Sequence, residues 1–169
     1  VASEATTEWT LLQDCNKHAQ LVRLNVAEAV DVLTLCARPG PQLPLSGVWH
    51  AAGVLADVLL HRQTARTLHH VHAPKAHGAC LLQHRFASAS LDACALFSSV
   101  AALLGGAGQA NYSAANSQLD TLAQARRAAG QTGVSVQWGA WAEVGMAARG
   151  AAAERMAAME TTSGFGRRG

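Results

Sequence analysis

The sequence predicts an α/β fold with a parallel sheet, because short apolar runs alternate with segments of helical periodicity along its 169 residues. Half of these residues are hydrophobic and only 14% are charged, which fits one domain with a buried core. The stretch from Leu96 to Asn116, LFSSVAALLGGAGQANYSAAN, predicts a strand ending in a hydroxyl group, a flexible loop, and a helix carrying a phenol. In an open parallel sheet, ligands bind beyond the carboxyl ends of such strands.

The N-terminal part of the chain is expected to contain two helices and two strands. Apolar residues at helical spacing predict helices over residues 7–17 and 27–37. A strand is expected over 19–24, between these helices. A loop rich in proline and glycine over 39–44 precedes a second expected strand over 45–51.

The C-terminal part repeats this alternation. The longest predicted helix covers residues 64–86, with Thr64 as its N-cap and with Pro74 expected to kink or divide it. A strand is expected over 91–97, a helix over 109–129 and a last strand over 134–138. Gly130 and Gly133 are expected to end the helix that precedes this strand.

Composition and charge exclude several functional classes. The formal net charge of +2 argues against a nucleic-acid-binding protein, and no apolar stretch is long enough to predict a membrane span. No signal-peptide pattern is present at the start of the sequence. Four widely spaced cysteines form no CxxC pair, which predicts free thiols in a reducing, cytoplasmic compartment: Cys15, Cys36, Cys80 and Cys94.

Histidines are concentrated in the longest predicted helix, and they raise the question of a metal site. His69 and His72 share one helix face, as residues three positions apart do. No HExxH motif and no cysteine partner accompanies them, so we expect a polar helix face and no bound metal.

Four polar residues carry a resemblance to a known family: Lys75, Ser99, Tyr112 and Asn116. Most short-chain dehydrogenases/reductases have lysine four positions after the tyrosine, whereas this chain has asparagine there and a lysine upstream. This exchange, together with HAAG at 50–53 and WGAWAEVGM at 138–146, resembles the ketoreductase domain of modular polyketide synthases and animal-type fatty acid synthases. The resemblance covers roughly residues 20–150 and implies a Rossmann-like, doubly wound parallel sheet with flanking helices.

The resemblance implies roles for the four residues in reducing a ketone. Tyr112 would be the general acid, and the Lys75 ammonium would stabilise the phenolate that proton transfer leaves behind. Ser99 would donate a second hydrogen bond to the ketone oxygen, where negative charge develops. Asn116 lies on the same helix face as Tyr112 and would hold Lys75 or an ordered water in a proton relay.

The resemblance also implies NADPH as the cofactor. The segment LVRLNVAEAVDVL, residues 21–33, resembles the third strand and following helix of the family, with an asparagine near the adenine where relatives usually have aspartate. The HAAG turn would lie along the ribose and nicotinamide. The implied cofactor-binding residues are Asn25, Val26, His50, Ala51, Ala52, Gly53, Lys75 and Tyr112.

Other residues are implied to control the substrate and the stereochemistry. Asp57 takes the last position of the family's LDD motif, which is associated with B-type reduction to the D-configured β-hydroxy product. Ala56 and Ala114 depart from the B-type pattern. The substrate lid is expected over 139–160, followed by a flexible tail over 161–169, and the candidate substrate residues are Asp57, Trp138, Gly139, Trp141 and Met146.

The implied reaction is reduction of a β-ketoacyl thioester, carried on an acyl carrier protein, within a polyketide synthase that holds further domains. Two alternatives remain: a free-standing reductase of small ketones, and a non-catalytic, truncated ketoreductase module. We expect residues 1–169 to be a partial domain, because the family's first strand, its glycine-rich phosphate loop and its last strand have no counterpart in the sequence. This piece by itself is therefore expected to bind NADPH weakly and to be inactive.

Overall fold

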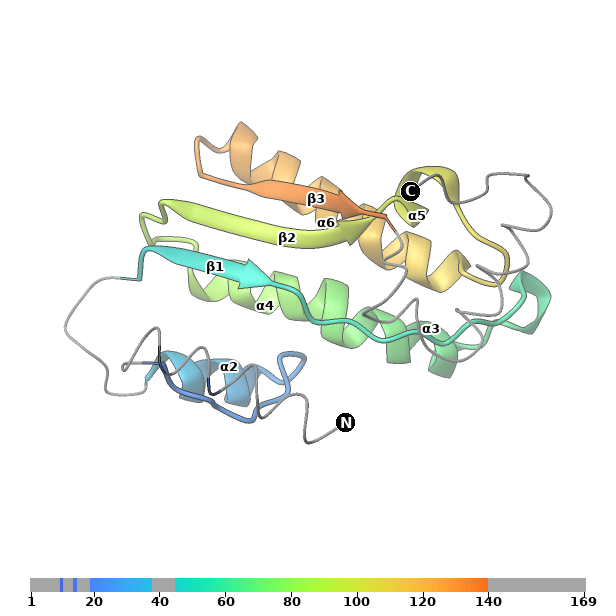
Figure 1. The fold of residues 1–169 in the computed structure, drawn as a ribbon, viewed down its shortest axis with the longest axis horizontal. Helices are drawn as coiled ribbons and strands as arrows, with labels where there is room; N and C mark the ends of the chain where they lie inside the picture. Colours follow the sequence, from blue (N-terminus) through green and yellow to red (C-terminus); the bar gives the residue numbers. More distant parts are fainter. Residues whose placement is uncertain (1–9, 11–13, 15–18, 38–44, 140–169) are drawn as a thin grey trace.

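The computed structural model of the protein describes residues 10, 14, 19–37 and 45–139. Its centre is a parallel sheet in the order β1-β2-β3, formed by Gly47–His50, Ala93–Ser99 and Val134–Trp138 (Figure 1). The predicted parallel sheet with flanking helices is thus confirmed. The last strand has the predicted bounds, and the other two are shifted by a few residues.

Helices pack against one face of this sheet, with α4 and α6 lying behind the strands in Figure 1. The helical elements are α2 (Ala29–Cys36), η1 (Leu60–Arg62), α3 (Ala65–His72), η2 (Ala73–His77), α4 (Gly78–Arg85), α5 (Ala101–Leu104) and α6 (Ala110–Ala128). Among the described residues, no helix combines the length and apolar character that a membrane span requires.

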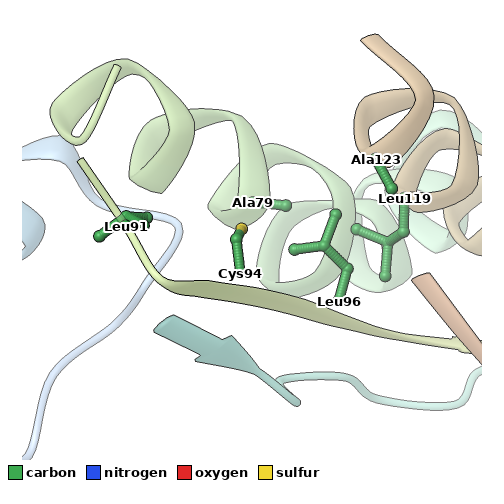
Figure 2. Close-up of a cluster of buried hydrophobic side chains, with 6 residues drawn as sticks. All are labelled: Ala79, Leu91, Cys94, Leu96, Leu119 and Ala123. Carbon is green, nitrogen blue, oxygen red and sulfur yellow. The ribbon is translucent and has the colours of Figure 1, made fainter. Parts of the chain in front are cut away.

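Strand register assigns the side chains of β2 to two faces. Leu96 lies opposite Ser135 and Ser98 lies opposite Gln137, so these four side chains share the face toward the helices. Ser99 alternates to the other face. On the helix side, a buried cluster joins the strand to α4 and α6 (Figure 2): Ala79, Leu91, Cys94, Leu96, Leu119 and Ala123. This core fixes both helices against the sheet.

The prediction of a strand over 19–24 is wrong. The structure describes this segment as irregular chain, with Leu21 77% exposed. A strand is stabilised by hydrogen bonds to a neighbouring strand, and within the described ranges the outer edge of β1 pairs with no segment. The apolar residues at 21–24 therefore lack, within the described part of the chain, the neighbouring strand that would make this segment a strand.

The single helix predicted over 64–86 is three consecutive helical elements. Its first turn is closed by a capping box, in which Thr64 Oγ1 accepts from Thr67 N and Thr67 Oγ1 accepts from Thr64 N. Proline has no N–H to donate, and the wide π-helical turn η2 contains Pro74 and separates α3 from α4. The predicted division of the helix is confirmed.

Replacing Thr64 with alanine is expected to lower the free energy of unfolding by about 1 kcal/mol, because the Thr67 backbone N–H in the first turn of α3 loses its acceptor and the contact between the two hydroxyl groups is lost. The measurement is urea denaturation of the protein. Thr121→Ala is the matched control, since its hydroxyl only donates to a carbonyl oxygen within the exposed part of α6. Equal losses in the two variants would contradict the capping role.

Three thiols lie in the described part of the chain, and all three are free: Cys36, Cys80 and Cys94. Cys94 belongs to the buried core, and burial raises the pKa of its thiol. The other two are half-buried. Cys15 lies outside the described residues.

Candidate active site

The parallel strands bring three candidate residues to one edge of the sheet. His50, Ser99 and Trp138 are the last residues of β1, β2 and β3, and carboxyl ends of parallel strands lie at the same edge. Ser99 and Trp138 are register partners, whereas β1 ends at the level of Leu96. The edge is therefore stepped, with the end of β1 set back from the serine.

Lys75 reaches this edge from the π-helical turn. Its side chain is buried, with only 2% of its surface exposed, and its Nζ donates to the carbonyl oxygen of Phe97 at 2.8 Å. The buried imidazole of His50 donates from Nε2 to the backbone carbonyl oxygen of Lys75 at 2.8 Å. β1 and β2 thus fix both the backbone and the amine of this residue.

Burial controls the charge of Lys75. Removal from water disfavours the ammonium form and lowers its pKa from 10.5 to about 8, while the nearby negative charge of Asp120 acts in the opposite direction. Burial also lowers the pKa of His50, and the Lys75 charge adds to this effect. At neutral pH the ammonium form of Lys75 still predominates, since its pKa lies above the pH.

Tyr112 lies in the first turn of α6, beside this ammonium. The Lys75 Nζ is 5.5 Å from the centre of the Tyr112 ring, which is within the range of a cation–π contact. The ring is 9% exposed and packs with Val71, Ala76, Ala101 and Ala115. The amine of Lys75 and the ring of Tyr112 therefore lie beside each other.

Asn116 follows one turn later and is completely buried. Its side-chain Nδ2 donates to the backbone carbonyl oxygen of Tyr112 at 2.8 Å. The backbone carbonyl oxygen of Asn116 accepts from Ser98 Oγ at 3.3 Å. Its side-chain Oδ1 is buried and has no hydrogen-bond partner among the described residues. A buried acceptor of this kind favours the binding of a further donor, such as a water molecule or an amine.

Ser99 differs from Ser98 in what its hydroxyl group does. Ser98 is buried and ties β2 to α6, whereas Ser99 is half-buried and its Oγ accepts from Ala101 N at 3.2 Å. This bond uses a lone pair of Ser99, so its hydroxyl proton can be donated to a ligand. Of the two serines, Ser99 has the geometry of a ligand donor.

The Asp57 segment is attached to the loop that leads into α6. Gln109 Nε2 donates to Asp57 Oδ1 at 3.4 Å, and Val58 N donates to the Gly108 carbonyl oxygen at 2.9 Å. Gly108 has a φ of +73°, a conformation that favours glycine. These bonds place the candidate stereocontrol residue next to the start of the Tyr112 helix.

Asn111 reinforces this connection. Its Nδ2 donates to the Ala56 carbonyl oxygen at 2.8 Å, and its Oδ1 accepts from Tyr112 N at 2.8 Å. This buried amide therefore links the Asp57 segment to Tyr112. The sequence reasoning missed it, because one asparagine before a tyrosine carries no pattern of its own.

The remaining candidate cofactor residues lie in two segments, one before α2 and one after β1. Asn25 is in the turn before α2, where its Oδ1 accepts from Ala27 N at 3.1 Å, and Val26 packs against Gly78 of α4. The HAAG residues Ala51, Ala52 and Gly53 follow β1 as irregular chain. 

Of the candidate substrate residues, Trp138 contacts the Phe97 ring at 5.6 Å between centroids, and a side chain at Gly139 would meet no atom of the described residues within 4 Å. Trp141 and Met146, with the rest of the lid and the tail, lie outside the described residues.

Comparison with known proteins assigns this arrangement to a family. A family model described as the KR domain matches residues 1–143, which is most of the chain. The chain belongs to the ketoreductase domain family. Its similarity to the spectinabilin polyketide synthase system protein NorB of Streptomyces orinoci is 46% identity over 73% of the chain. Its identity to polyketide synthase GfsB of Streptomyces halstedii is 43% over 81% of the chain.

Solved ketoreductases share its fold. The ketoreductase domain from the bacillaene assembly line matches 97% of the chain with a TM-score of 0.79 and 30% identity. An A-type ketoreductase from a modular polyketide synthase matches 80% with a TM-score of 0.76 and 38% identity. These matches confirm the Rossmann-like fold. The chain spans 6% and 2% of the two synthases, and 40% and 29% of the two solved ketoreductase chains.

Proposed function

We propose that this ketoreductase chain contributes the active site for NADPH-dependent reduction of a β-ketoacyl thioester to a β-hydroxyacyl thioester. In this proposal the substrate is carried on an acyl carrier protein, and the reductase acts in the cytoplasm beside other domains of a polyketide synthase. The observation that carries the proposal is the Lys75 ammonium 5.5 Å from the Tyr112 ring, at the edge where Ser99 ends β2.

The residues at this edge fit a nicotinamide cofactor. An ammonium group has three N–H donors, and one hydrogen bond from Lys75 Nζ is described, to Phe97, so further donors can bind ribose hydroxyls. Ala51, Ala52 and Gly53 follow β1 with little or no side chain, which permits close approach of a ligand to the backbone. Bound NADPH would supply the hydride.

The side chains would supply the proton and the stabilisation of charge. Tyr112 would donate its phenolic proton to the ketone oxygen as that oxygen becomes an alkoxide. The adjacent Lys75 ammonium would stabilise the resulting phenolate. Ser99 would donate a hydrogen bond to the same oxygen, and the buried Oδ1 of Asn116 would hold the water or amine that returns a proton to the phenolate.

The experiment that tests this proposal measures NADPH consumption by the full-length protein with a short β-ketoacyl thioester, free and on an acyl carrier protein, and with a simple ketone of equal size. We expect the thioester, and above all its carrier-bound form, to be reduced in preference to the simple ketone. Preference for the simple ketone would support a free-standing reductase, and no turnover with any of them would support a non-catalytic module. Chiral analysis of the product tests the Asp57 assignment, for which we expect the D-configured alcohol.

A further inference from the structure

Asp120 lies two helical turns after Tyr112 and one turn after Asn116, on the face of α6 that contacts the sheet. Both of its carboxylate oxygens are held by β3. Oδ1 accepts from Ser135 Oγ at 2.6 Å, and Oδ2 accepts from Gln137 Nε2 at 2.8 Å. Both partners are neutral, so they fix the carboxylate in place without cancelling its negative charge.

Strand register brings this carboxylate to the level of Lys75. Gln137 is the register partner of Ser98, and Ser98 adjoins Phe97, whose carbonyl oxygen accepts from Lys75 Nζ. Ser98 also donates to the backbone of Asn116, one turn before Asp120. The carboxylate is thus built into the same junction of β2, β3 and α6 that holds the ammonium.

We propose that Asp120 is a positioning residue that maintains the positive charge of Lys75 at the active site, and so sets the alkaline limit of ketone reduction. The inference rests on the proposed function for its catalytic consequence. It concerns a group that touches neither substrate nor cofactor and acts through Lys75.

Electrostatics supports this role. Burial lowers the pKa of Lys75 to about 8, and the Asp120 charge limits that decrease. Asp57 is held by Gln109 at the start of α6, and Asp120 is the carboxylate whose charge raises the pKa of Lys75. The other titratable groups on β1, α3, η2, α4 and α6 are not carboxylates. His50 donates to the Lys75 backbone, Tyr112 is a phenol, and the histidines of α3, η2 and α4 are neutral or cationic: His69, His70, His72, His77 and His84.

The test is the Asp120→Asn variant of the full-length protein, which removes the charge and keeps the shape. An asparagine amide can still accept from Ser135, and the Gln137 amide can rotate to present its oxygen. We expect the alkaline pKa of kcat/KM to fall by about one pH unit, with activity at pH 6.5 close to that of the original protein. Asp120→Glu, which restores the charge, is expected to recover most of the alkaline limb.

Ser135→Ala is the matched control, because it removes one of the two hydrogen bonds and leaves the charge. Its pH profile is expected to match that of the unaltered protein. An equal loss of rate at every pH in Asp120→Asn would show a merely structural role and would overturn the proposal.

A second measurement is independent of turnover. Only the neutral amine of Lys75 reacts with acetic anhydride, so trace acetylation across pH 6.5–10, followed by mass spectrometry of its peptide, reports its pKa. The midpoint is expected at lower pH in Asp120→Asn than in the unaltered protein. An unchanged midpoint rejects the role of Asp120 even if reduction is observed. Absence of reduction together with a shifted midpoint rejects the proposed function alone.

Discussion

Replacement of Tyr112 by phenylalanine is expected to lower kcat for ketone reduction by roughly 100-fold or more, because the phenylalanine ring has no proton to donate to the developing alkoxide. The remaining ring keeps its contacts with Val71, Ala76, Ala101 and Ala115, so the free energy of unfolding should change little. Steady-state kinetics at saturating NADPH and thioester give the rate, and urea denaturation gives the stability.

Ser113→Ala is the matched control for this experiment. It also removes a hydroxyl group from the first turns of α6, one residue from Tyr112, and its Oγ has no partner among the described residues. We expect its kcat to stay near that of the original protein. If Tyr112→Phe reduces the thioester at a comparable rate, the general acid is another group and the assignment of Tyr112 is wrong.

Replacement of Lys75 by methionine is expected to abolish most of the activity and to change how stability depends on pH. Loss of the ammonium removes the charge that stabilises the phenolate, for which we expect a decrease in kcat on the order of 100-fold. Methionine has a similar length and no charge to desolvate. The variant therefore reports two effects in separate measurements: kcat reports what the ammonium contributes to catalysis, and the free energy of unfolding reports what its burial costs the folded protein.

The sign of the pH effect follows from the lowered pKa of Lys75. Between about pH 8 and 10.5 the unfolded chain still binds a proton at this position while the folded protein has released it, so stability rises with pH in this window. The stability of Lys75→Met relative to the original protein should thus be highest below pH 8. It should decrease by up to about 3 kcal/mol as the pH approaches 10.5.

Urea denaturation at several pH values between 7 and 10 measures this difference. Arg85→Met is the control, because it removes an exposed cation that stays charged throughout this range, and its effect should be nearly independent of pH. A constant difference between Lys75→Met and the original protein would contradict the buried, desolvated state of the amine.

Several elements of the fold could be predicted from local sequence. The helix α6 and the strand β3 have marked periodicity and clear ends, and the structure has them within one residue of the predicted bounds. Thr64 and Pro74 act on the backbone next to them, so the N-cap and the divided helix were predictable as well. The segment 19–24 shows the limit of such reasoning, since a strand exists only with a partner.

The candidate site was predicted by a family resemblance in the spacing of four side chains, and not by any one of them. The placement of Lys75 beside the Tyr112 ring is consistent with that prediction, while the catalytic roles stay predictions. Asn111 and Asp120 were missed. Asp120 did have a signal, because it continues the four-residue spacing of Tyr112 and Asn116 along one face of a helix.

The sequence by itself determined the alternation of strands and helices and the cap and break around α3, and through the family resemblance it supplied the candidate site residues. These depend on backbone preferences and on chemistry that each residue carries locally. Only the tertiary structure decided that Ser98 rather than Ser99 faces the helices, that Lys75 is desolvated beside Tyr112, and that β3 holds the Asp120 carboxylate. Strand register, burial and electric fields arise between segments far apart in the chain, so no local pattern encodes them.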